Sequence, residues 1–312
     1  MSRSVLLQEG RAKLNQKIGP MLDCPGPMTA KIIDGKSLAA ATRAALKQKV
    51  DALVQRGVRP GLTVIIAGDD PASKVYVRNK ALGAKEIGVR SEVLEYGNDV
   101  SESELLDRVA RLNANREVHG ILVQLPLPKH IPAARVLEAI APAKDVDGFH
   151  EANLGALMAG RAGVVPCTPL GCIRLIEHAG VQVAGRHAVV LGRSNIVGKP
   201  VAMLLLQRDA TVTICHSKTP RLEAITKQAD ILVAAVGRAK LVGAQMVKPG
   251  ACVIDVGVNR LPDGKLAGDV DFEAVKQVAG SITPVPGGVG PMTIAMLLEN
   301  CISAAAREEP AP

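Results

Sequence analysis

The sequence is poor in aromatic residues, and this limits the kinds of ligand it can bind. Its 312 residues include two Phe, two Tyr and no Trp, although 47% of the chain is hydrophobic. Proteins that hold single-stranded nucleic acid without sequence preference stack the bases on aromatic side chains, so this composition argues against such a surface. Ala, Val, Ile and Leu must build the interior instead, as they do in buried parallel strands covered by helices.

Cysteine pairs and metal-binding spacings are missing as well. The six Cys form no C-x-x-C pair, and most lie within apolar segments, where a reduced thiol packs as a small hydrophobic group. This usage fits a reducing compartment, so we expect a cytoplasmic protein. The six His occur singly, without H-E-x-x-H or another ligand spacing, so we expect no metal site.

Long hydrophobic runs are also lacking. We find no apolar stretch of about 18 residues and therefore expect no segment that spans a membrane. Residues 1–29 are basic but have no sustained apolar region, which makes them a poor secretory signal. We expect a disordered extension there, with Met28 as an alternative start, and a transit peptide is the competing interpretation.

The charge of the chain is basic but dispersed. The formal net charge is +8, and the Lys and Arg residues are scattered along the chain and not gathered into a run. Such a charge permits attraction to a polyanion, but a small phosphorylated or polyglutamylated anion is an equally good partner. A well-solvated basic surface is the simplest interpretation, and we expect no nucleic-acid partner.

Length and periodicity predict an α/β protein with two domains. A chain of 312 residues exceeds the size at which one hydrophobic core usually stops growing. Buried strands alternate with helical patterns in two series, which predicts parallel sheets with crossover helices. The first series has strands at 62–67, 89–94 and 120–125 and helices at 37–56, 71–87 and 101–114. The second has strands at 187–191, 211–215, 231–235 and 252–256 and a last helix at 291–305.

A glycine turn after the strand at 187–191 predicts a dinucleotide site. The segment Gly192 to Pro200 leads from that strand through Arg193 and Ser194 into a helix that begins near Gly198. Glycine lets the backbone approach a pyrophosphate, and the helix N-terminus offers unpaired N–H groups. The spacing is G-x5-G and not G-x-G-x-x-G, so a purely structural turn is the alternative.

The end of the next strand indicates which cofactor this site binds. An NAD site normally supplies Asp or Glu there to hold the ribose 2′-hydroxyl, and this chain has no acid at that place. His216, Ser217, Lys218 and Thr219 offer hydroxyl and cationic groups that suit a 2′-phosphate. We therefore predict NADP, with an ordinary Ser/Thr helix cap as the alternative.

A polar face on the helix predicted at 71–87 is the first candidate for catalysis. Asp70 has the character of an N-cap residue, and it starts the helix that carries the candidates. Offsets of three and four residues place Ser73, Tyr76 and Lys80 on one face, so a hydroxyl, a phenol and an amine point the same way. An exposed polar stripe is the alternative.

Three further segments support the same hypothesis. Gln124 ends a buried strand, and its carbonyl can orient an amine for acid/base chemistry. Asp147, in the pattern Asp-x-Asp-Gly, offers a carboxylate to the N–H groups of a heterocycle, although this pattern is also an ordinary turn. Pro286, Gly287 and Gly288 precede the last helix, where glycine backbone can approach a ligand closely, and a tight helix start is the alternative.

Taken together, these segments resemble the bifunctional, FolD-like methylenetetrahydrofolate dehydrogenase/cyclohydrolase family over residues 30–304. The matching segments, in the family's order, are Ser73 to Lys80, Gly120 to Pro128, Lys144 to Phe149, Pro166 to Pro169, Gly192 to Pro200, His216 to Thr219, Val253 to Arg260 and Pro284 to Thr293. The resemblance implies that Lys80 is the essential acid/base residue and that Gln124 tunes it. It also implies that Tyr76 packs against the folate and that Asp147 anchors the pterin-like ring.

The same resemblance implies the ligands and their contacts. The residues expected to touch NADP are Gly192, Arg193, Ser194, Ser217 and the backbone of Val258, and we add His216. The expected substrate-binding residues are Ser73, Tyr76, Asp147, Pro286, Gly287 and Gly288. The implied reactions are oxidation of 5,10-methylenetetrahydrofolate with NADP+ and hydrolysis of the methenyl product to 10-formyltetrahydrofolate, which belong to one-carbon metabolism and purine biosynthesis.

The implied architecture is a homodimer whose subunits each have two domains with a cleft between them. We expect a catalytic domain of parallel α/β type from residues 30–148, closed by the C-terminal helix in 287–312. A Rossmann-type NADP-binding domain then spans 149–286. The sequence departs from the family at Glu151-Ala152, where the family usually has proline, and this affects only the loop between the domains.

Three other functions share some of these features. A short-chain dehydrogenase shares the Tyr76-x-x-x-Lys80 spacing, but its glycine turn precedes the tyrosine, whereas Gly192 follows Tyr76 here. A non-enzymatic, nucleic-acid-binding Rossmann protein would explain the basic charge, but the sequence has no basic cluster to support it. A monofunctional dehydrogenase is the third, and the presence of both Lys80 and Gln124 argues against it.

Overall fold

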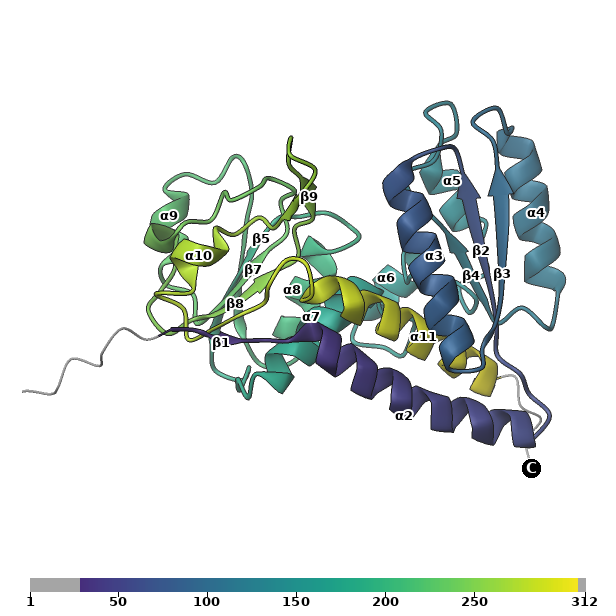
Figure 1. The fold of residues 1–312 in the computed structure, drawn as a ribbon, viewed down its shortest axis with the longest axis horizontal. Helices are drawn as coiled ribbons and strands as arrows, with labels where there is room; N and C mark the ends of the chain where they lie inside the picture. The colour runs from purple at the N-terminus through teal and green to yellow at the C-terminus, as the bar shows by residue number, and fades with distance from the viewer. Residues whose placement is uncertain (1–28, 308–312) are drawn as a thin grey trace, which may run out of the picture.

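The computed structural model describes residues 29–307 and shows two α/β units joined by long helices (Figure 1). One unit contains a three-stranded sheet and the other a six-stranded sheet. The predicted α/β fold with two domains is therefore confirmed. The expectations of a disordered extension and of an alternative start at Met28 concern residues that lie outside the described range, apart from residue 29.

The first unit is built on three parallel strands in the order β3-β2-β4. Its strands are β2 (Gly61–Ala67), β3 (Arg90–Tyr96) and β4 (Gly120–Val123), and its helices are α3 (Pro71–Glu86), α4 (Glu102–Ala114) and α5 (Ala133–Glu138). β2 is buried along its whole length because it is the central strand. α4 begins where the Ser101 side chain accepts a hydrogen bond from the Glu104 N–H, as an N-cap residue does.

The second unit is a parallel sheet in the order β1-β11-β8-β7-β5-β6. Its strands are β1 (Lys31–Ile32), β5 (His187–Leu191), β6 (Thr211–Cys215), β7 (Ile231–Ala234), β8 (Cys252–Asp255) and β11 (Ser281–Ile282). Its helices are α6 (Glu151–Met158), α7 (Cys167–His178), α8 (Gly198–Leu206), α9 (Leu222–Thr226), α10 (Phe272–Val275) and the short 3-10 helix η1 (Ala244–Met246). A separate antiparallel hairpin joins β9 (Asn259–Arg260) to β10 (Leu266–Ala267).

The first described strand belongs to the sheet of the second unit. Lys31 and Ile32 pair in parallel with Ser281 and Ile282 of β11. The sequence-based division assigned the chain from residue 30 to the first domain, so the structure places these residues on the other side. A strand of two residues has no readable periodicity, which explains the difference. α2 (Gly35–Gln55) then carries the chain across to the first unit (Figure 1).

The last helix, α11 (Val289–Arg307), joins the two units. It contacts α2, α3, β2 and β4 on one side and α7 on the other. By length and composition it is apolar enough to cross a membrane, so the expectation that the sequence has no apolar stretch of about 18 residues is wrong for this helix. Its apolar side chains are mostly buried inside the protein, with Met292, Met296 and Leu297 inaccessible. The packing is therefore that of a core helix.

Candidate active site

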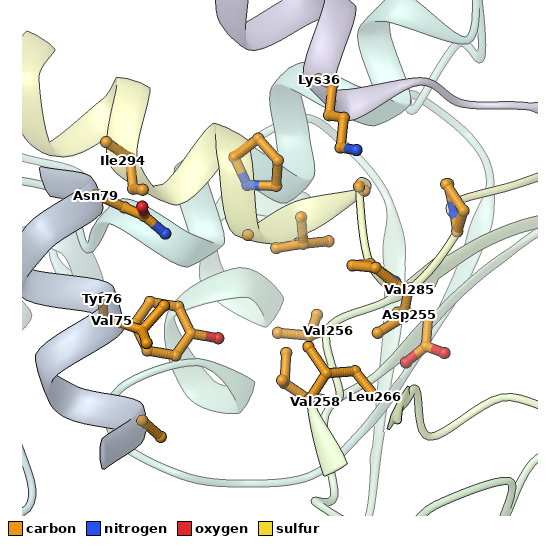
Figure 2. A pocket seen from close by; sticks show the side chains of 18 of the residues that line it. Lys36, Val75, Tyr76, Asn79, Asp255, Val256, Val258, Leu266, Val285 and Ile294 are labelled. Carbon is orange, nitrogen blue, oxygen red and sulfur yellow. The ribbon is translucent and has the colours of Figure 1, made fainter. Parts of the chain in front are cut away.

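A cavity of about 590 Å³ lies between the two units. α3 contributes Tyr76 and Asn79 to its wall, and the segment that follows β8 contributes Val258. The predicted segment Pro286 to Gly288 closes another side, just before α11. In Figure 2 the Tyr76 hydroxyl points across the cavity towards Val256 and Val258. Tyr76, Val258 and the glycine segment, which are far apart in the sequence, therefore share one cavity.

The local sequence at the start of α3 sets the direction of its polar face. Asp70 is the N-cap, and its Oδ2 accepts hydrogen bonds from the Ser73 N–H and hydroxyl, both at 2.8 Å. Ser73 and Lys80 are buried, whereas Tyr76 is 37% exposed in the cavity. Partial burial raises the pKa of Tyr76, so this residue presents a neutral phenol at physiological pH.

The amine of Lys80 is bonded to an amide whose orientation is fixed. Lys80 Nζ donates to Gln124 Oε1 at 3.0 Å. Gln124 Nε2 donates in turn to the Leu125 carbonyl at 2.7 Å, so the amide oxygen must face the lysine. The Ser73 hydroxyl lies 3.4 Å from the same carbonyl. The chain Lys80–Gln124–Leu125 thus links α3 to the end of β4.

Asp147 lies close enough to Lys80 to interact with its charge. Burial raises the pKa of Asp147 to about 6; the positive charge of Lys80 opposes this shift and the negative charge of Asp145 adds to it. Asp145 itself is tied into the loop, because its carboxylate accepts from the backbone N–H groups of Gly148 and His150 at 3.1 and 2.9 Å. The loop therefore keeps the second carboxyl, Asp147, beside the lysine.

A residue that sequence reasoning missed holds the Asp147 loop from α11. Asn300 Nδ2 donates to the carbonyls of Val146 and Val165, each at 2.9 Å. The Cys167 thiol also donates to the Val146 carbonyl, at 3.1 Å, and burial keeps the pKa of this thiol well above its usual value. The carbonyl directly before Asp147 is therefore fixed twice. No local pattern could reveal this, since 154 residues separate Asn300 from Val146.

The polar group and the cavity are neighbouring parts of the site. Lys80, Gln124 and Asp147 form the polar group, and among the described residues they are not part of the cavity wall. Tyr76 stands in that wall on the same helix face as Lys80. α3 accordingly connects the two parts.

The glycine turn after β5 has the shape required for close approach of an anion. Gly192 has φ +119°, and a methyl group there would overlap the Ala235 carbonyl oxygen. The Ser194 hydroxyl accepts from the N–H groups of Val197 and Gly198 at 3.1 and 3.3 Å, at the start of α8. Arg193 and Ser194 are exposed beside these groups. The turn and the helix N-terminus fit a dinucleotide pyrophosphate.

The end of β6 lies beside this turn and carries no acid. The Gly192 N–H donates to the Cys215 carbonyl at 2.9 Å, which brings the two strand ends together. His216 Nδ1 accepts from the Lys218 N–H at 3.2 Å, so the imidazole shapes the loop, while Ser217 and Lys218 are exposed. A hydroxyl and a cation without a carboxylate fit a 2′-phosphate. Within residues 29–307, no three His, Cys, Asp or Glu side chains are grouped as metal ligands would be.

Cationic side chains that were not singled out from the sequence also line the cavity. They are Lys36 and Arg43 of α2 and Arg260 of β9. In Figure 2 the Lys36 amine points down into the cavity. The only local signal for Lys36 was its place in the first turn of α2, where the Asp34 side chain accepts from its N–H at 2.9 Å.

Comparison with known proteins gives consistent matches to both units. The family models "Tetrahydrofolate dehydrogenase/cyclohydrolase, catalytic domain" and "Tetrahydrofolate dehydrogenase/cyclohydrolase, NAD(P)-binding domain" match residues 33–147 and 166–309. The bifunctional protein FolD of Verminephrobacter eiseniae is 60% identical over 285 residues, which cover 91% of this chain and 100% of that one.

Solved structures are similar over the same range. The bifunctional FolD methylenetetrahydrofolate dehydrogenase/cyclohydrolase from Campylobacter jejuni has a TM-score of 0.88 and 48% identity, covering 90% of this chain and 100% of that one. The methylenetetrahydrofolate dehydrogenase-cyclohydrolase (FolD) from Trypanosoma brucei, complexed with NADP cofactor and inhibitor, has a TM-score of 0.86 and 42% identity. That match covers 89% of this chain and 98% of the other.

Proposed function

The chain belongs to the tetrahydrofolate dehydrogenase/cyclohydrolase family, and on this basis we propose how its residues share the work of two reactions. The enzyme oxidises 5,10-methylenetetrahydrofolate to 5,10-methenyltetrahydrofolate with NADP+ and hydrolyses the product to 10-formyltetrahydrofolate. The observation that carries the assignment of roles is the hydrogen bond from Lys80 to Gln124, at 3.0 Å and in a largely buried position.

Lys80 is the acid/base residue of ring opening. In this step the oxygen of water bonds to the methenyl carbon, the bond from that carbon to one ring nitrogen breaks, and that nitrogen takes up a proton. A single amine that accepts one proton of water and delivers it to the nitrogen serves both transfers, and the second proton of water is released to solvent as the formyl carbonyl forms. Gln124 positions the amine, because its amide oxygen is held towards Lys80 by the Leu125 carbonyl.

Asp147 and Tyr76 bind the folate. Asp147 offers a carboxyl group to the N–H groups of the pterin-like ring, and Asn300 supports this position through the Val146 carbonyl. Tyr76 presents its ring to the cavity, where it can pack against the flat part of the substrate. Ser73 anchors the start of α3 through Asp70, and Pro286 to Gly288 border the folate from the opposite wall.

NADP+, when bound, supplies the acceptor for the hydride. The residues that would hold it are Gly192, Arg193, Ser194, His216, Ser217 and Val258. The positive φ of Gly192 and the start of α8 support a pyrophosphate position. Ser217 and Lys218 support the preference for a 2′-phosphate, since both are exposed beside the Gly192 turn.

We also propose the assembly, the compartment and the division of the chain. Residues 30–148 with α11 form the catalytic domain, apart from β1, and 149–286 form the NADP-binding domain. The second unit offers β6 as the outer strand of its sheet, and Ile214, Leu206 and Met158 are exposed on that unit, which supports a homodimer. Buried free thiols at five cysteines support a reducing, cytoplasmic location. Light scattering of the purified chain tests the dimer.

The first experiment compares wild type with Lys80→Met in an assay that follows NADPH and the methenyl product separately. We expect wild type to produce NADPH while little methenyl product accumulates. Lys80→Met should slow ring opening about 100-fold or more, since general acid/base catalysis contributes about 10²–10⁴-fold. Lys85→Met, which changes an exposed lysine on the same helix, is the matched control and should behave as wild type.

Two outcomes would contradict the proposal. Absence of NADPH formation by wild type would contradict the dehydrogenase function itself. Normal hydrolysis of methenyltetrahydrofolate by Lys80→Met would leave the function intact but remove Lys80 from the acid/base role.

A further inference from the structure

Two buried carboxylates lie in the second unit beside the cavity, and the reactions above do not use them. Asp255 ends β8 and is 3% exposed, and Asp269 follows β10 and is fully buried. Neither carboxylate has an ion-pair partner within residues 29–307. Burial of a carboxylate without a cation is costly, so hydrogen bonds must compensate. The hydrogen-bond partners of the two carboxylates therefore show what these side chains hold in place.

Asp269 accepts hydrogen bonds from the loop that follows β7. Its Oδ2 accepts from the N–H groups of Val236 and Gly237, at 2.6 and 3.0 Å. Its Oδ1 accepts from the Arg238 N–H at 2.8 Å and from Asn259 Nδ2 at 3.0 Å. One carboxylate thus ties the β7 loop to β9, which begins just after Val258.

Asp255 accepts hydrogen bonds from the segment that carries Asp269. Its Oδ1 accepts from the N–H groups of Gly257 and Asp269, at 3.0 and 2.9 Å, and its Oδ2 accepts from Val270 N–H at 3.0 Å. Burial raises the pKa of Asp255 to about 7, and the negative charge of Asp269 adds to the shift. The two carboxylates are therefore coupled through the backbone and form a single unit, which we call the Asp255–Asp269 pair.

The glycines around the pair show how closely the backbone surrounds it. A methyl group at Gly257 would overlap the Asp269 carboxylate, and one at Gly268 would overlap the Asp255 carboxylate. Both glycines have negative or extended backbone angles, so the close approach, and not a turn conformation, requires them. Each loop is accordingly shaped around the carboxylate that it binds.

The segments that the pair fixes form the edge of the proposed nucleotide site. The β7 loop begins directly after Ala235, whose carbonyl oxygen lies against Gly192. The β8 loop contains Val256 and Val258, which line the cavity with Tyr76 (Figure 2). In an open α/β sheet, loops at the carboxyl ends of the strands bind the ligand. The pair therefore sets the spacing of two loops that must both meet the cofactor.

We propose that Asp269, supported by Asp255, is a positioning residue for NADP: it holds the β7 and β8 loops in the arrangement that the cofactor needs and has no part in ring opening. This inference rests on the proposed function of the Gly192 turn. It predicts a separation of the two activities, because hydrolysis of methenyltetrahydrofolate needs no NADP.

The test uses Asp269→Asn, which keeps the size of the side chain but turns an N–H group towards backbone N–H groups. Binding of NADP is measured by calorimetry without folate, and hydrolysis of methenyltetrahydrofolate is measured without NADP. We expect NADP affinity to fall about 10–100-fold, because a shift of binding groups by about 1 Å can have an effect of this size. Hydrolysis should stay within about twofold of the wild-type rate. Asp263→Asn, an exposed acid in the β9–β10 hairpin, is the matched control.

A second variant covers the case in which Asp269→Asn does not fold. Asn259→Ala removes a single donor to Asp269 and should weaken NADP about threefold to tenfold, with hydrolysis unchanged. An equal loss of NADP affinity and hydrolysis in either variant, or normal NADP binding in both variants, would overturn this inference and leave the proposed function intact. Failure of wild type to bind NADP would overturn the cofactor assignment and the inference with it.

Discussion

The two halves of the cleft are built by different means. In the first unit the site consists of side chains from separate elements: Lys80 from α3, Gln124 after β4 and Asp147 from the loop before α6. In the second unit it consists mainly of backbone, shaped by Gly192 and by the Asp255–Asp269 pair. On the proposed roles, we expect ring opening to depend on a few side-chain atoms and NADP binding to depend on the shape of several loops.

Because of this difference, we expect mutations in the two halves to impair different activities. Removal of one functional atom should abolish chemistry in the first unit and leave binding of NADP intact. A change of backbone shape in the second unit should do the reverse. Because ring opening needs no cofactor, the two activities of one chain report separately on the two halves.

The largest effect that separates the halves is expected from Gly192→Ala. Its φ of +119° is unsuitable for alanine, and the new methyl group would overlap the Ala235 carbonyl oxygen. The turn must move, so we expect NADP affinity and the dehydrogenase rate at limiting NADP to fall about 100-fold or more. Hydrolysis of methenyltetrahydrofolate should stay near the wild-type rate. Calorimetry with NADP and the hydrolysis assay measure the two quantities.

Gly185→Ala is the matched control for this variant. Gly185 also has a positive φ, +75°, but a methyl group there has open space around it. It should therefore lose about 1 kcal/mol of stability and no NADP affinity. Equal loss of NADP affinity in the two variants would mean that backbone strain alone, and not the shape of the Gly192 turn, controls binding.

The difference between the two halves also explains which parts of the fold and site could be predicted from the sequence. The strands at 187–191 and 211–215 have the bounds predicted for them. The first is a buried, continuous apolar run, as central parallel strands are. The second is an edge strand in which Thr alternates with apolar residues. The strand predicted at 120–125 ends at Val123, so Gln124 directly follows the strand, where its side chain reaches Lys80. Polar side chains at strand ends and on a helix face carry local signals, so the sequence could predict that Lys80 and Gln124 meet, while their catalytic roles stay predictions.

The residues for which we propose a supporting role carried no such signal. Asn300 looks like an ordinary polar residue of an apolar helix, and its partner Val146 is far away in the sequence. Asp255 ends an apolar strand and Asp269 follows a hairpin, so both resemble turn residues until the loops are folded around them. Long-range backbone contacts leave no periodic pattern, and only the structure shows them.

An intermediate effect is expected from Asn300→Leu, which loosens a side-chain site without touching its reactive atoms. The carbonyls of Val146 and Val165 would lose their N–H donor, and the Cys167 thiol alone would hold the Val146 carbonyl. The Asp147 loop should then shift, raising the KM for folate in both reactions about tenfold while NADP affinity is kept. Steady-state kinetics of each reaction, together with NADP calorimetry, separate these effects.

Ser303→Ala is the control for Asn300→Leu, since Ser303 is exposed on the same helix. It should leave both KM values unchanged. A loss of NADP affinity in Asn300→Leu that matches its loss of folate affinity would contradict the division of the cleft, because α11 would then support both halves equally.

The last effect concerns stability and not activity, and it compares one carboxyl group in each half whose pKa is raised by burial. The pKa of Asp147 is about 6 and that of Asp255 about 7 in the folded chain, against 3.8 as the usual value for both. The native state therefore binds each proton more tightly than the unfolded state does. This contribution to stability is fully present below about pH 4 and is lost as pH rises, through about pH 6 for Asp147 and about pH 7 for Asp255.

Asp147→Asn removes the pH-dependent contribution of Asp147 to stability, because an amide does not titrate. Relative to wild type, the variant should gain stability between pH 4 and pH 7 by at most about 3 kcal/mol, since each pKa unit corresponds to about 1.4 kcal/mol. Thermal unfolding should show this as a Tm difference that grows by several degrees up to about pH 6 and then stays constant. Asp107→Asn, at an exposed position on α4, should show no such growth. A difference that does not change between pH 4 and pH 7 would contradict the raised pKa of Asp147.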